Sequence, residues 1–99
     1  MEIIIKETAL HLKLSPVEVQ TFEHEGVCKQ KVVIGEEPLM VLLQRTSENE
    51  MRVTLHTNLI TLLVPENLAD EWINGDSTRL ETQDGALQLL VEKVEDLEN

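Results

Sequence analysis

Aromatic side chains are almost missing from this sequence. Phe22 and Trp72 are the only two among its 99 residues, and there is no tyrosine. The apolar share of 41% is therefore almost entirely aliphatic, a composition that favours sheets faced with Leu, Ile and Val. Binding of single-stranded nucleic acid relies on aromatic rings on which bases stack, so the composition argues against such a platform.

Basic side chains are also scarce. Eight Lys and Arg stand against 19 Asp and Glu, which gives a formal net charge of −11. Affinity for nucleic acid comes from clustered cations that contact phosphates, and anionic membranes attract the same clusters. We therefore expect no nucleic-acid partner and no membrane partner. Opposite charge speeds encounter, so a protein with a basic or mixed surface is the favoured partner.

Cysteine occurs once, at Cys28, which excludes an internal disulfide and fits a reducing compartment. The apolar run at residues 3–5 is too short for a signal peptide. No stretch approaches the length of a membrane span. These absences predict a cytoplasmic protein.

Recognisable catalytic and metal-binding motifs are absent. The three histidines and the cysteine do not pair at the spacing of a zinc site. No glycine-rich phosphate loop is present, since the four glycines all fall at expected turns. Cys28 has no identifiable activating base. We expect no catalytic residue, no cofactor and no metal, and we favour a non-catalytic protein over an enzyme.

An internal repeat is the most informative feature that is present. Five residue pairs recur at a separation of 49 positions: Thr8 and Thr57, Leu10 and Leu59, Leu14 and Leu63, Pro16 and Pro65, and Gly26 and Gly75. A repeat on this scale indicates duplicated structural units. It predicts one domain over residues 1–99, with pseudo-repeats at 2–45 and 50–93 and an acidic tail at 94–99.

Each half is predicted to contain two strands, a helix and two strands. Period-two alternation and turn residues place the elements. In the first half the strands are at residues 3–5, 9–14, 28–34 and 39–43, with a turn at 35–38 and a helix from 16 to about 26. In the second half they are at 51–56, 59–64, 78–82 and 87–91, with a helix from 65 to about 75.

Helix and turn signals define the candidate structural residues. Ser15, Pro16 and Glu18 form a capping box with proline at the first helical position. Leu68 and Trp72 share one helix face and are expected in the core. The residues to which we assign structural roles are Ser15, Pro16, Gly26, Pro65, Leu68, Trp72, Gly75, Asp76 and Gly85.

Neither half could bury its single apolar face alone, whereas two copies packed about a pseudo-twofold axis could. The predicted fold is α+β and mainly antiparallel. The duplicated units are expected to form a barrel or a strongly curved sheet, with two short helices covering an open end or face.

The second half resembles the cradle-loop barrels, which include swapped-hairpin antitoxins, transition-state regulators and double-psi barrels. The resemblance lies in residues 64–69, in Gly75-Asp76 and in residues 84–87. In that group a proline-led helix ends at a Gly-Asp pair that enters the next strand. The resemblance implies a barrel and an antitoxin-like or regulator-like role.

The chain as a whole is similar to a family of short uncharacterised bacterial proteins. The shared motifs are a helix with Pro65, Leu68, Ala69 and Trp72, and a closing strand that ends in residues 91–93. This similarity implies no known activity.

The favoured function is a non-catalytic protein-interaction or accessory module. Its partner is expected to be another protein, with self-association as the other option. One alternative function is an antitoxin-like or regulator-like partner of a basic protein. The other is a small carboxylate-dependent enzyme, which requires two acidic groups that converge in a pocket with raised pKa values.

Overall fold

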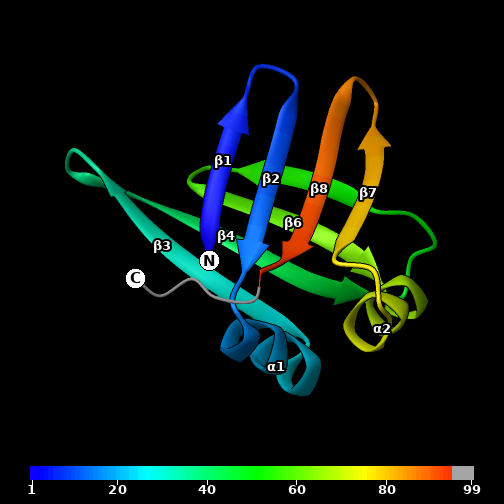
Figure 1. The fold of residues 1–99 in the computed structure, drawn as a ribbon. Coiled ribbons are helices and arrows are strands. Elements are labelled where there is room, and N and C mark those ends of the chain that lie inside the picture. The colour runs from blue at the N-terminus through cyan, green and yellow to red at the C-terminus, as the bar shows by residue number, and fades with distance from the viewer. Residues whose placement is uncertain (95–99) are drawn as a thin grey trace.

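The computed structural model describes residues 1–94, which form two four-stranded sheets and two helices (Figure 1). Sheet A contains β1 (Glu2–Lys6), β2 (Ala9–Leu14), β8 (Leu87–Lys93) and β7 (Arg79–Asp84), in that spatial order. Sheet B contains β3 (Val27–Ile34), β4 (Glu37–Thr46), β6 (Leu59–Pro65) and β5 (Arg52–His56), in that spatial order. The helices are α1 (Pro16–Glu25) and α2 (Glu66–Asn74).

Each half of the chain gives one hairpin to each sheet. The hairpins β1–β2 and β7–β8 meet in sheet A, and β3–β4 and β5–β6 meet in sheet B. Pairing within each hairpin is antiparallel, whereas the two central pairs, β2–β8 and β4–β6, are parallel. The predicted α+β class and the duplicated order of strand, strand, helix, strand, strand are confirmed, although both sheets are mixed rather than purely antiparallel.

The predicted barrel or single curved sheet is wrong. The strands of residues 1–94 form two separate sheets that face each other with crossed strand directions (Figure 1). Where β5 meets β7, the backbone N–H of Val53 donates to the carboxylate of Asp84 at 3.0 Å. This link is a side-chain contact and not a strand ladder, so the barrel implied by the cradle-loop resemblance is not formed.

Equivalent positions of the two halves lie 50 residues apart, not 49. The bounds of β1 and β5 differ by 50 at both ends, and so do the first residues of α1 and α2. Buried side chains follow the same spacing: Leu12 and Leu62, Leu14 and Val64, Phe22 and Trp72, and Val41 and Val91. This one-residue difference in spacing matters because neighbouring residues of a strand face opposite sides. Leu10 is buried, whereas Leu59, 49 positions later, is only half-buried and faces away from the core.

The two helices begin differently. Ser15 caps α1: its hydroxyl accepts from the backbone N–H of Glu18, whose carboxylate accepts from the backbone N–H of Ser15. Pro65 is the residue before α2 and provides no side-chain cap. Pro16 and Pro65 both stand at a helix start, but the structural equivalent of Pro65 is Ser15.

The helix ends also differ. Gly26 ends α1 in the left-handed region, with φ of 79°, and its N–H bonds to the carbonyl of Phe22. Gly75 ends α2 in an extended conformation. A Cβ at Gly75 would lie 2.5 Å from the carbonyl oxygen of Glu71, so the close approach of the chain to the last helical turn requires glycine there.

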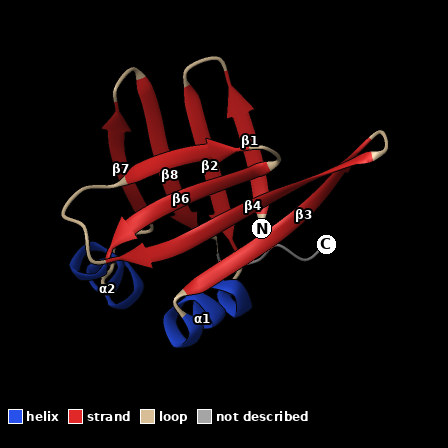
Figure 2. Cartoon of the chain, turned by 180° about the vertical axis from the view of Figure 1, so that it is seen from behind, coloured by secondary structure: helices blue, strands red, loops and turns tan. Residues whose placement is uncertain are grey.

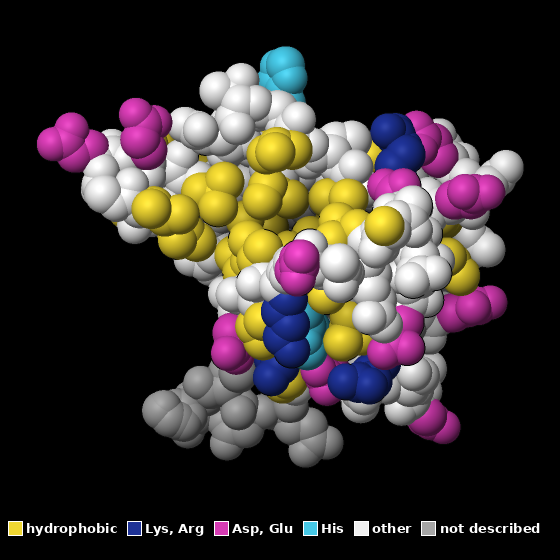
Figure 3. Space-filling model, turned by 90° about the horizontal axis from the view of Figure 1, so that it is seen from above, with side chains coloured by type: hydrophobic (Ala, Val, Ile, Leu, Met, Phe, Trp, Pro, Cys, Tyr) yellow, Lys and Arg dark blue, Asp and Glu magenta, His cyan; other side chains and the backbone are white. Residues whose placement is uncertain are grey.

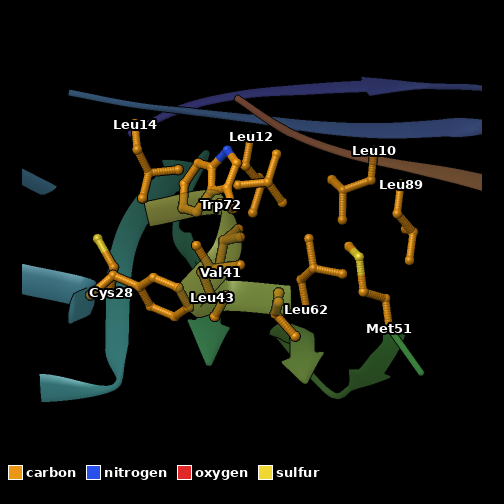
Figure 4. Close-up of a cluster of buried hydrophobic side chains, with 14 residues drawn as sticks. Leu10, Leu12, Leu14, Cys28, Val41, Leu43, Met51, Leu62, Trp72 and Leu89 are labelled. Atoms are coloured by element: carbon orange, nitrogen blue, oxygen red, sulfur yellow. The ribbon is translucent and has the colours of Figure 1, made fainter. Parts of the chain in front are cut away.

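The core fills the space between the sheets, and the helices cover one end of it (Figures 1 and 4). Trp72 of α2 is only 3% exposed, and its ring meets that of Phe22 edge-to-face at a centroid distance of 6.3 Å. The indole N–H donates to the carbonyl of Thr78 at 3.1 Å. The Lys93 ammonium lies over the same ring and donates to the carbonyls of Trp72 and Gly75. These contacts close the helical end of the sandwich.

The β3–β4 hairpin projects further than its counterpart. Ala9 pairs with Gln88 in sheet A, whereas the equivalent Leu59 pairs with Met40 and not with Pro38. This two-residue slide leaves the first part of β4 without β6 as a neighbour, and the hairpin forms an arm (Figure 2).

Several predicted boundaries change. The turn predicted at residues 35–38 contains only Gly35 and Glu36, since Glu37 and Pro38 already pair with β3. Pro38 is tolerated because β4 has a strand neighbour on one side only at this point. The predicted acidic tail at 94–99 lies, apart from Val94, outside the described residues.

Candidate functional site

The central strands of sheet B are apolar on both faces. In β4 and β6 the inward side chains Val41, Leu43, Leu62 and Val64 are buried in the core. The outward side chains alternate with them and are half-buried: Met40, Leu42, Leu59 and Leu63. None of these four belongs to the core or packs against it. Strands with apolar residues on both faces are typical of sheets that are covered on both sides.

No described helix covers this outer face. Figure 2 shows sheet B toward the viewer, with α1 and α2 below it at the end of the sandwich. We call the patch formed by Met40, Leu42, Leu59 and Leu63, together with Thr61 between them, the outer face of sheet B. It is an apolar surface presented by a rigid scaffold, and its alternation follows directly from the strand period.

The strands that flank this patch contribute basic side chains. Lys29 pairs with Leu42 and Lys31 pairs with Met40, which places both lysines on the same face along β3. On the other side, His56 pairs with Leu59 and Arg52 with Leu63. Glu48 forms two hydrogen bonds with Arg52 at 2.9 and 3.0 Å, which lower the pKa of Glu48 and raise that of Arg52.

No Asp or Glu occupies an outward position of the paired segments of sheet B. This composition is unexpected in a chain with a net charge of −11. Within the described residues, Lys29 and Lys31 form no ion pair. The outer face of sheet B therefore combines an apolar centre with a border of two lysines along β3.

A second apolar surface lies at the end of the sandwich away from the helices. A cleft of about 230 Å³ opens there between the two sheets, lined mainly by aliphatic side chains that include Ile5, Leu10, Leu55 and Ile60. Ile5 and Leu55 are 59% and 72% exposed, and Figure 3 shows a continuous hydrophobic patch over this end. Leu55 has the inward register of Val53 on β5, yet it is exposed because it lies at this open end of the sandwich.

The outer face of sheet A is polar by comparison. A hollow of about 460 Å³ on this face is lined by Lys6, His11, Lys13 and Arg79 among others. His11 Nε2 lies 2.9 Å from Glu92 Oε1, and Arg79 is within 4 Å of both Glu81 and Glu92. Glu92 thus pairs with both His11 and Arg79 across the strands, whereas Lys6 and Lys13 form no ion pair with other described residues.

The pKa shifts of Cys28 and Glu18 do not favour a reactive thiolate or a general acid. Burial raises the pKa of the Cys28 thiol, and the charge of Glu18 adds to this effect, so the thiolate is disfavoured. Burial acts to raise the pKa of Glu18, but hydrogen bonds from the Met1 amino group and Ser15 outweigh it and the pKa is lowered. No group of three potential metal ligands occurs among residues 1–94.

The residues assigned structural roles from the sequence lie away from the outer face of sheet B. Most of them surround the helices: Ser15, Pro16, Gly26, Pro65, Leu68, Trp72, Gly75 and Asp76. Gly85 forms the β7–β8 turn with φ of 65°. Pro16, Gly75 and Asp76 also line a hollow of about 520 Å³ between the helices.

Sequence reasoning missed the outward residues of β4 and β6. The signal was available in the near-continuous apolar runs at residues 39–43 and 59–64, which differ from the clean alternation of residues 9–14.

The chain belongs to DUF7009. The model of this family of unknown function matches residues 1–98. No curated protein matches the chain. Membership of DUF7009 agrees with the expected similarity to uncharacterised proteins and assigns no activity. No helix of the described part of the chain is long and apolar enough to cross a membrane.

Proposed function

We propose that this member of DUF7009 is a non-catalytic interaction module that binds another protein through the outer face of sheet B. The observation that carries the proposal is the pair of central strands whose outward side chains, Met40, Leu42, Leu59 and Leu63, are apolar and uncovered by any described element. Contiguous exposed apolar surface bordered by polar residues marks interaction sites in folded proteins.

The enzymatic alternative receives less support. It requires two converging carboxyl groups with raised pKa values, whereas the carboxyl pKa values that shift, those of Glu18 and Glu48, are both lowered. His11 lines the hollow on sheet A, but its partner Glu92 is not among the residues that line it, and Glu92 also lies within 4 Å of Arg79.

The test compares two matched substitutions. Met40 and Leu90 are equivalent residues, 50 positions apart, and both are half-buried and outward on a central strand. Affinity capture from native lysate is performed with the wild type, Met40→Glu and Leu90→Glu, and captured proteins are cross-linked to map their contacts. We expect Met40→Glu to lose the partner and Leu90→Glu to retain it, with cross-links at β4 and β6.

Both variants should remain folded because neither side chain enters the core, and circular dichroism and thermal melting provide the control. Capture of the same proteins by folded Met40→Glu and by wild type would contradict the proposal.

A further inference from the structure

A partner that binds the outer face of sheet B would contact side chains and not backbone hydrogen-bonding groups. β4 and β6 are central strands, each hydrogen-bonded to neighbours on both sides. A partner strand could pair only at the edges, β3 and β5, and would leave the apolar centre uncovered. An α-helix packed on the apolar sheet face as a third layer would bury it without backbone pairing.

The dimensions of the face suit one helix. Neighbouring strands lie about 4.8 Å apart, so the distance from β3 to β5 is roughly 14 Å. A helix with its side chains is about 10–12 Å wide. A helix laid over β4 and β6 therefore covers the apolar centre and brings its two flanks near Lys29 and Lys31 on one side and His56 on the other.

Charge selects the kind of helix. Along β3 the border of the face carries Lys29 and Lys31, which form no ion pair with other described residues. Along β5 it carries His56 and Arg52, and Arg52 is paired with Glu48. A basic helix would meet like charges, whereas acidic side chains on the flanks of the helix would complement the border.

A second copy of the chain fits this face poorly. In a symmetric dimer the same patch would face itself, which would bring Lys29 and Lys31 near the cations of the other copy.

We infer that the outer face of sheet B binds an amphipathic α-helix of another protein, with an apolar stripe and acidic flanks. This inference rests on the proposed function, because it names the partner of the same surface. The apolar stripe would pack on Met40, Leu42, Leu59 and Leu63, and the acidic flanks would lie against Lys29, Lys31 and His56.

Synthetic peptides test the inference directly. One helical peptide of about 18 residues, or roughly 27 Å, carries a leucine stripe and glutamate flanks. A second has lysine in place of glutamate, and a third has the composition of the first in shuffled order. We expect saturable binding of the first peptide alone, measured by fluorescence anisotropy and weakened by salt.

Charge reversal provides the decisive comparison. In Lys29→Glu/Lys31→Glu, affinity for the glutamate peptide should fall about tenfold, and the lysine peptide should gain affinity. The matched variant Arg79→Glu/Glu81→Arg alters equivalent positions on sheet A and should leave binding unchanged.

The outcomes separate the two proposals. Equal binding of all three peptides, or binding of none, overturns the inference about the helix. If the protein forms a dimer and Met40→Glu abolishes that dimer, the inference about the helix is also overturned, because a second copy of the chain would then occupy the face. If no peptide binds but capture from lysate still depends on Met40, the proposed function stands without the acidic helix. If capture does not depend on Met40, the proposed function fails as well.

Discussion

The two sheets have the same strand order and equivalent buried residues, but their outer faces differ. At four equivalent outward positions on the central strands, sheet A has Ala9, Lys13, Leu90 and Glu92, and sheet B has Leu59, Leu63, Met40 and Leu42. Both inner faces must fill one close-packed core, so duplication preserves their apolar pattern. The outer faces are free of that requirement. All four of these positions are apolar only on sheet B, and this difference is the basis of our proposal that sheet B binds another protein.

The largest effect on stability is expected where the two halves of the chain pack against each other. Trp72 and Phe22 are equivalent residues, both buried, that pack against each other. Trp72→Ala should destabilise the protein by about 3–5 kcal/mol, and Phe22→Ala should have a similar effect. Urea denaturation measures both. A small loss of stability in either variant would show that the two halves do not share a common core. Leu55→Ala, at an exposed position, serves as the control.

A second expected difference lies at the helix ends. Gly75→Ala places a Cβ 2.5 Å from a backbone oxygen, whereas Gly26→Ala meets nothing closer than 3.9 Å but is strained by its φ of 79°. We expect a loss of about 2 kcal/mol at Gly75 and about 1 kcal/mol at Gly26. Thermal unfolding measures the stability of the two variants. A larger loss of stability in Gly26→Ala than in Gly75→Ala would contradict the expected order.

Exchange of outer-face residues should alter binding more than stability. Leu42→Glu gives sheet B the residue found at the equivalent position of sheet A, Glu92. The stability change should stay within about 1 kcal/mol because Leu42 does not contribute to the core. Binding of the glutamate-flanked peptide should weaken about tenfold or more. Unchanged affinity, measured alongside an unchanged melting temperature, would remove the functional distinction between the two sheets.

The sequence predicted the elements because their signals are local. Alternation at residues 9–14 and the capping box at Ser15 depend on neighbouring residues alone. The repeat was misaligned by one residue because identical residues, such as Pro16 and Pro65, were matched, although they occupy different places at the helix starts. Strand faces, rather than identities, fix the correct alignment.

The arrangement of hairpins could not be read from the sequence. Whether β2 pairs with β8 in one sheet, or joins β6 in a closed barrel, depends on contacts between distant segments that leave no local pattern. The outer face of sheet B was partly readable, since continuous apolar runs indicate a strand that is apolar on both sides. Its cationic border required the strand register, which places Lys29 and Lys31 beside Leu42 and Met40.

The smallest expected effect concerns the two helix starts at low pH. Glu18 in the capping box of α1 has a lowered pKa, whereas the equivalent position in α2 is Leu68, which does not titrate. A carboxyl whose pKa is lowered by folding stabilises the native state above its unfolded value near 4.5, and that contribution is lost as the pH falls through the folded value. Glu18→Gln should therefore lower stability by about 1 kcal/mol at neutral pH.

The difference between Glu18→Gln and wild type should shrink as the pH falls below the unfolded value, because the wild-type carboxyl becomes protonated. Urea denaturation at neutral pH and at several acidic values measures this convergence. Leu68→Gln serves as the matched substitution at the start of α2, and its effect should not depend on pH. A constant gap between Glu18→Gln and wild type across the acidic range would show that the charge of Glu18 does not stabilise the start of α1, and the asymmetry between the two helix starts would then be one of hydrogen bonding alone.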